Sequence, residues 1–273
     1  MKTTAQIIRE YRGPALFSFG FRPFFLLAAI WAALAIPLWL LPILSATGNM
    51  AAVFTRDWHV HEMLFGYTSA VIVGYMIIAG ANWTGNYPVA GWPVMVLTGL
   101  WVAGRIAMLA QPALGFLAAI VDASFLLLFA LALWREQLAA KNWRSLGPCI
   151  IISFLATANI GFHARTIMPE LGAMAERAAI GLVIFLIAMM GGRLVPSFTR
   201  NWMAQRKIRT EPAPYGRFDT GALALAGAAI AAWVLKPEVT LSGILLTAAG
   251  AGLFIRLLRW RGWLAITDGM VFI

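Results

Sequence analysis

Charged side chains are scarce in this sequence of 273 residues: Asp, Glu, Lys and Arg make up 12%, whereas hydrophobic residues make up 61%. A soluble domain carries about a quarter charged residues, so the composition excludes an ordinary soluble globular protein. Cysteine is represented by Cys149 alone, which excludes an intrachain disulfide and a CxxC site. Histidine occurs three times, so any histidine-based site draws on a very small set.

Long apolar stretches are abundant by contrast, and eight of them approach the ~20 residues needed to cross a bilayer. They are Phe24–Ile43, Met63–Ala81, Trp92–Ala110, Ala113–Trp134, Leu146–Thr166, Ala178–Phe198, Thr220–Leu235 and Val239–Leu258. Because backbone groups find no partners in lipid, these stretches should be helices. The sequence therefore predicts an all-α, polytopic transmembrane helical bundle, with residues 1–273 forming a single integral membrane domain.

The end of the chain predicts a further, truncated span. After Arg261 the sequence turns apolar again (WLAITDGMVFI) and stops about halfway through what could be a ninth span. We expect either a short amphipathic tail or the N-terminal part of a longer architecture.

The net charge of +10 is unevenly distributed among the connections between spans. Of the 21 Lys and Arg residues, Arg105 and Arg193 fall inside spans. With the N-terminus inside, the outer connections receive only Arg56, Arg165, Arg177 and Lys236, and the remaining fifteen lie on the inner side. This bias predicts a multi-pass membrane protein with a cytoplasmic N-terminus. The excess of basic residues is therefore explained by membrane topology and by contact with anionic lipid, and not by binding to nucleic acid.

All three histidines are predicted to lie toward the outer face. The stretch RDWHVHEMLFGYTSA places His59 and His61 at the outer end of the second span, and His163 lies in the last turns of the fifth, one turn after Asn159. His59 and His61 are two residues apart, so they can meet one metal only if the helix starts after His59. Histidines bonded to interfacial loops are one interpretation; their common face favours metal or haem ligation.

Two charges lie deeper, Arg105 in the third span and Asp122 in the fourth. Antiparallel geometry about the turn near Gln111–Pro112 offsets them by four residues, or ~6 Å, which an Arg side chain can bridge. They form either a neutralising ion pair or a site at which Arg105 points toward an anion, such as a haem propionate.

Small residues and a proline mark two further features. Gly66, Ala70 and Gly74 form a stripe that admits a close neighbouring helix or a flat cofactor. Arg193, with Pro196 one turn on, predicts a kinked helix with a buried cation. Polar clusters at this depth fit an anchoring belt, or a cytoplasmic proton inlet or substrate gate.

The motifs GFRPFF, WHVHEMLFGY, NWTG, LWVAGR, NIGFH and GGRLVPSFTRNW occur in this order over residues 15–205. In this respect the chain resembles the NnrS family. The resemblance implies a polytopic bacterial inner-membrane protein that contains haem and copper and responds to nitric oxide and nitrosative stress. The residues that match its motifs are His59, His61, Glu62, His163, Arg105, Arg193 and Pro196. The resemblance also implies further helices and histidines beyond the end of this chain.

The chemistry allows two divisions of the ligands. Haem needs one or two axial histidines, and copper is well served by imidazole. Three histidines give either a bis-histidine haem through His61 and His163 with His59 spare, or a single-histidine haem with a two-histidine copper. In both cases Glu62 could move protons.

Together with this chemistry, the resemblance implies a haem b and copper protein that binds or reductively converts nitric oxide or a small nitrosyl species, with an unidentified electron donor. The predicted metal ligands are His59, His61 and His163, and the predicted cofactor-binding residues are His61, His163, Arg105 and Asn159. Two other classes remain open: a haem or copper sensor or assembly factor without enzymatic activity, and a secondary transporter without metal.

Overall fold

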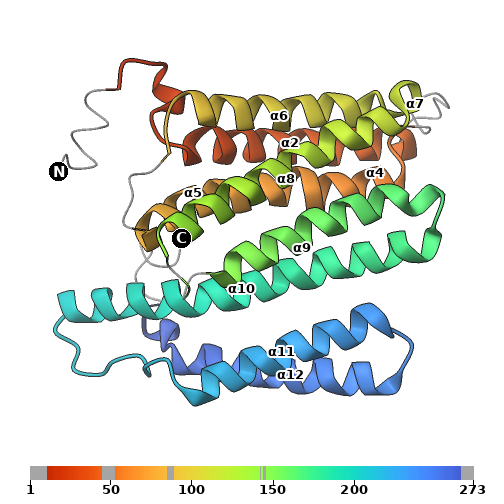
Figure 1. Ribbon diagram of the computed structural model, residues 1–273. Helices are drawn as coiled ribbons and strands as arrows, with labels where there is room; N and C mark the ends of the chain where they lie inside the picture. Colours follow the sequence, from red (N-terminus) through yellow and green to blue (C-terminus); the bar gives the residue numbers. More distant parts are fainter. Residues whose placement is uncertain (1–10, 45–52, 85–88, 142, 144–145, 266–273) are drawn as a thin grey trace. The chain divides into compact units, whose positions relative to one another are not determined.

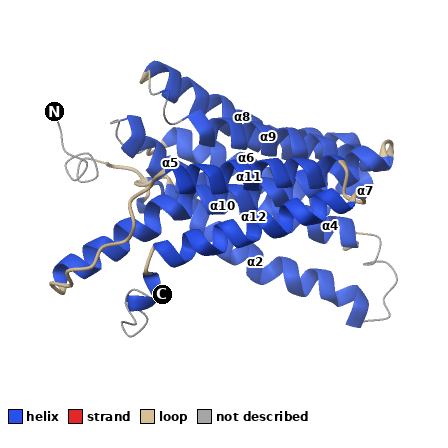
Figure 2. Cartoon of the chain, turned by 90° about the horizontal axis from the view of Figure 1, so that it is seen from below, coloured by secondary structure: helices blue, strands red, loops and turns tan. Residues whose placement is uncertain are grey.

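The computed structural model describes residues 11–44, 53–84, 89–141, 143 and 146–265. The regular secondary structure of these residues is entirely helical, with no strand (Figures 1 and 2). The elements are η1 (Ala15–Phe17), α2 (Phe21–Leu44), α4 (Arg56–His61), η2 (Glu62–Tyr67), α5 (Thr68–Thr84), α6 (Trp92–Leu109), α7 (Gln111–Leu114), α8 (Phe116–Ala139), α9 (Leu146–His163), η4 (Ala164–Thr166), α10 (Pro169–Gln205), α11 (Arg217–Leu235), α12 (Thr240–Arg259) and η5 (Gly262–Ala265).

Eight helical segments in the described part of the chain are long and apolar enough to cross a membrane. Each of the eight predicted stretches falls on one of them, so the all-α, polytopic fold is confirmed. The boundaries differ most at α10, which extends beyond the predicted span at both ends. Most of the predicted ninth span, from residue 266 onward, lies outside the described residues.

The chain divides into two compact units, Met1–Glu176 and Arg177–Ile273. In the first unit α8 packs against α6, α9 and α5, while α2 packs against α5 (Figure 1). Gly104 permits the close approach of α6 to α8, because a Cβ atom there would lie 3.3 Å from the Cα of Asp122. This approach places the neighbouring residue, Arg105, beside Asp122.

The second span begins earlier than predicted, at Arg56 instead of Met63. Thr55 caps the new start, and its hydroxyl accepts a hydrogen bond from the backbone N–H of Trp58 at 3.1 Å. The segment η2 is a π-helix that links α4 directly to α5. Such single-turn π-helical insertions are frequent at functional sites, and this one begins at Glu62.

The stripe of small residues serves helix packing. A Cβ at Gly74 would lie 2.9 Å from the ring of Phe25 on α2, and Ala70 is fully buried. At Gly66 a Cβ would lie 2.7 Å from the carboxylate of Glu62 and even closer to the guanidinium of Arg105. The absence of a side chain at Gly66 therefore leaves room for this pair of charged groups.

In the second unit α11 and α12 form an antiparallel hairpin built on small residues. Ala226, Ala229 and Ala249 form its buried centre, with Phe185 of α10 packed against it. α10 continues as a helix through Pro196 to Gln205. The prediction of a buried cation in this region is wrong for Arg193, which is exposed.

Candidate metal centre

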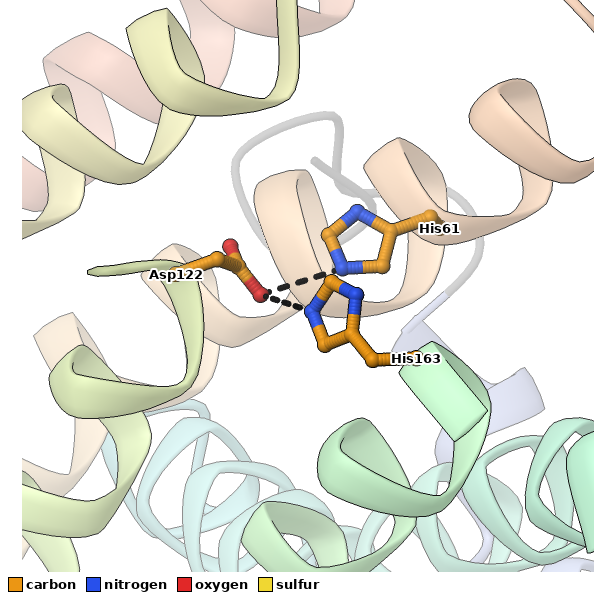
Figure 3. Close-up of side chains that lie close together, drawn as sticks. All are labelled: His61, Asp122 and His163. Carbon is orange, nitrogen blue, oxygen red and sulfur yellow. Dashed lines mark hydrogen bonds and ion pairs between the residues drawn. The ribbon is translucent and has the colours of Figure 1, made fainter. Parts of the chain in front are cut away.

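Three side chains from three helices meet in the interior of the first unit. The Nε2 atoms of His61 (α4) and His163 (α9) lie 3.1 and 3.0 Å from the same oxygen, Oδ2 of Asp122 (α8), as Figure 3 shows. One ligand atom from each residue can be chosen so that all three lie within 4.8 Å of one another. His61 and Asp122 are buried, and His163 is nearly so.

Two further polar residues complete the surroundings of His61. Its Nδ1 lies 3.0 Å from Oε1 of Glu62, which is fully buried. Asn159, one turn before His163 on α9, donates to Oδ2 of Asp122 at 2.9 Å and places its Oδ1 3.2 Å from Nε2 of His61. Glu62 thus holds one ring nitrogen of His61, and the other nitrogen faces the centre.

Arg105 supplies the positive charge next to these carboxylates. Its Nη1 donates to Oε2 of Glu62 at 2.5 Å, and its Nη2 donates to Oδ1 of Asp122. The predicted ion pair with Asp122 is therefore present, with Glu62 as a third member. Both terminal nitrogens of Arg105 are engaged by the chain's own carboxylates, and this arrangement lends no support to a propionate in that position.

His59 does not join the group. Its ring stacks on Trp39 of α2, with centroids 4.0 Å apart and planes 16° from parallel. The reason is the early helix start: with α4 beginning at Arg56, His59 and His61 are two positions apart in one regular helix and point in different directions. Of the three histidines, the structure brings together His61 and His163.

The donor geometry fits a single ion better than a haem between the two rings. Both Nε2 atoms lie about 3 Å from Asp122 Oδ2, which is the separation of hydrogen-bonded atoms and also that of two ligands about 2.0–2.1 Å from one ion at angles of about 90–110°. An axial pair of histidines needs a flat macrocycle between the rings. Here both nitrogens contact one carboxylate oxygen, and the ring centroids are only 4.8 Å apart.

Ion pairs at the predicted outer end position the two ligand-bearing helices. Arg165, in the turn after His163, bonds Oδ1 of Asp57 at 2.5 Å and also pairs with Glu176. Glu176 in turn accepts from Arg56 at 2.6 Å. This network links the start of α4 to the end of α9 and to α10, and so fixes the approach of His61 and His163.

A sequence model described as "NnrS protein" matches residues 15–273. The chain belongs to the NnrS family. The match extends past the last of the motifs quoted above and covers most of the first compact unit and all of the second unit of this NnrS chain. Comparisons with curated proteins and with solved structures found no match.

Asp122 is the member of this NnrS centre that sequence reasoning missed. It was predicted only as the partner of Arg105, although a carboxylate inside an apolar span is itself a signal of a functional position. Its alignment with His61 and His163 depends on the packing of α8 between α6 and α9. The spacing of residues within one helix does not predict which helices pack against one another.

Proposed function

We propose that this NnrS protein binds a transition-metal ion through His61, His163 and Asp122 and acts in the bacterial response to nitric oxide. The observation that supports the proposal is the convergence of two imidazole nitrogens and one carboxylate oxygen in an apolar interior. Imidazole donors suit copper, which we propose as the metal, and two histidines with one carboxylate also suit non-haem iron. A metal held by three protein ligands can offer open positions to a small ligand such as nitric oxide.

Glu62 has a defined part in this proposal. A metal-binding histidine usually donates its second ring N–H to a carboxylate, which fixes the tautomer and the ring orientation. Glu62 is placed to do this at Nδ1 of His61, which leaves Nε2 for the metal. Because Glu62 also contacts Arg105, its charge remains compensated while it holds the ring. We propose proton transfer as its second role.

The proposal adopts the second division of ligands, a two-histidine copper and a single-histidine haem b. With His61 and His163 in the metal centre, His59 is the histidine left for haem b. Nδ1 of His59 is buried without a hydrogen-bond partner among the described residues. Nitric oxide is small and neutral, so it can reach the centre through lipid. Its reductive conversion would also require an electron donor.

By the charge bias, the centre lies on the periplasmic side of the inner membrane, and the N-terminus is cytoplasmic. The position of the centre near the ends of α9 and the second span is consistent with this placement. Nitric oxide dissolves in lipid, so a site near the outer face needs no polar channel from the cytoplasm.

The test is the metal content of purified protein. His61→Ala, His163→Ala and Asp122→Asn should each reduce bound copper by about tenfold or more, because each removes one ligand. His59→Ala is the matched control and should retain copper while losing any haem absorption. Full copper occupancy in the His61 and His163 variants would contradict the ligand assignment. Consumption of nitric oxide under reducing conditions then distinguishes an enzyme from a sensor.

A further inference from the structure

The second unit contains a pocket of its own, with a volume of about 590 Å³. Arg193, Ser197 and Arg200 line it from α10, and their spacing of four and three residues places them on one helix face. Tyr215, just before α11, and Trp260, just after α12, line it from the facing segments. The pocket therefore collects residues of the GGRLVPSFTRNW motif that the metal centre does not use.

The acidic residue in the lining is already neutralised. Asp219 accepts from Nε of Arg256 at 3.1 Å, and Nη2 of Arg259 lies 3.5 Å from it. Arg256 is 1% exposed, and its Nη2 has no hydrogen-bond partner among the described residues. A Cβ at Gly192, which lines the pocket, would collide with that nitrogen. An unsatisfied donor of Arg256 is thus held directly behind the pocket wall.

The two arginines of α10 that line the pocket have little compensation. Arg193 has no ion-pair partner within the described part of the chain. Arg200 lies 3.8 Å from Glu211, and both side chains are largely exposed, at 48% and 72%, so this pair is weak. The pocket region carries four positive charges, on Arg193, Arg200, Arg256 and Arg259, and two negative charges, on Asp219 and Glu211. The region therefore has an excess of two positive charges.

The rest of the lining is apolar and includes Met189, Pro196 and Leu223. A ligand that fits must combine a compact anion for the arginines with a less polar portion for this wall. Guanidinium groups match the geometry of phosphate oxygens, and a hydroxyl such as that of Ser197 adds a donor. The charge bias predicts that this end of α10 faces the cytoplasmic leaflet, in which anionic lipids attract basic residues.

We propose that this pocket binds a phosphate group and that its source is the headgroup of an anionic phospholipid. The site lies in a different unit from the metal centre and shares no residue with it. Its occupancy can therefore be measured independently of metal content. Neither Arg193 nor Arg200 contributes to the ion pairs of the metal centre.

The experiment measures ligands bound to the full-length protein by native mass spectrometry after lipid has been removed. Short-chain phosphatidylglycerol, short-chain phosphatidylcholine and inorganic phosphate are titrated separately. Arg193→Gln and Arg200→Gln should each weaken phosphatidylglycerol binding by about tenfold or more, since each removes a charge-assisted contact. Arg209→Gln removes the same charge from an exposed position outside the lining and should bind within about twofold of the unmodified protein.

A second variant separates a lost site from a lost fold. Ser197→Glu keeps every arginine and introduces a carboxylate where the phosphate would lie, so it should also abolish binding. Competition by inorganic phosphate at a similar affinity would support the phosphate site and assign the source to the free anion. Unchanged phosphatidylglycerol binding in the Arg193, Arg200 or Ser197 variants would overturn the proposal. If phosphatidylcholine bound as tightly as phosphatidylglycerol, the proposal that the pocket selects an anionic headgroup would be overturned.

Discussion

Replacing Arg105 by Gln should destabilise this protein more than replacing Asp122 by Asn, although the two residues share one ion pair. Arg105 is 4% exposed and donates to the carboxylates of both Glu62 and Asp122. Arg105→Gln leaves two buried carboxylates facing the position of one lost guanidinium. Asp122→Asn leaves Glu62 paired with Arg105, so the remaining charges still balance.

The magnitudes follow from these two situations. Leaving a buried charge without its partner costs about 3–5 kcal/mol, the value expected for Arg105→Gln. Losing a hydrogen bond to a charged group costs about 1.5–3 kcal/mol, the value expected for Asp122→Asn. Asn at position 122 can still hydrogen-bond to the ring nitrogens of His61 and His163, and Glu62 keeps its pairing with Arg105. We expect a difference of about 2 kcal/mol between the variants.

The assay is reversible unfolding by sodium dodecyl sulfate in mixed lipid–detergent micelles. It is carried out on metal-free protein, so that loss of a ligand to a metal makes no contribution. Arg209→Gln, at an exposed position, serves as the control and should change the free energy of unfolding by about 0.5 kcal/mol or less. Equal losses of unfolding free energy in the two variants, or a larger loss for Asp122→Asn, would contradict the argument from the balance of buried charges.

Two further predictions concern packing and topology. Gly66→Ala should destabilise the protein by about 1–3 kcal/mol, because the new Cβ would lie 2.7 Å from the Glu62 carboxylate. Gly99→Ala, where nothing lies within 4 Å of the new Cβ, should be neutral or stabilising, because alanine has a higher helix propensity than glycine. A Gly99 variant destabilised as much as the Gly66 variant would show that the loss at Gly66 does not come from its close contacts. In a background without the native cysteine, Met168→Cys should react with an impermeant thiol reagent in intact cells and Thr210→Cys should not. The reverse labelling would invert the predicted faces.

The sequence was most informative about features that depend on composition and length. Apolar stretches of near-membrane length predicted all eight spans, and the offset of Arg105 and Asp122 about one turn predicted their ion pair. Three histidines toward one predicted face indicated the candidate site. Each of these inferences uses the spacing within one helix or across one short connection.

What the sequence did not reveal depends on caps and on packing between distant helices. The start of the second span was misplaced because Thr55 supplies a cap before a polar first turn, and hydropathy does not register such a turn. That start turns His59 toward Trp39 and away from His61. The addition of Asp122 to His61 and His163 requires three helices that are not all adjacent in the chain. The close approach of α6 and α8 at Gly104 adds Arg105 to this group.

In the proposed metal centre the same atoms serve stability and ligation, which explains how so polar a group persists in an apolar interior. Oδ2 of Asp122 faces two imidazole nitrogens and one amide, so hydrogen bonds hold the donor atoms together without an ion. A metal would compete for the lone pairs that those bonds use, and its binding would displace the protons from the nitrogens it takes. The affinity for the metal then depends on the free-energy difference between the hydrogen-bonded state without metal and the metal-bound state. In both states Glu62 holds the ring of His61. The arrangement favours an ion that forms strong bonds to imidazole, because a weak ligand-former would not outcompete the hydrogen bonds already present.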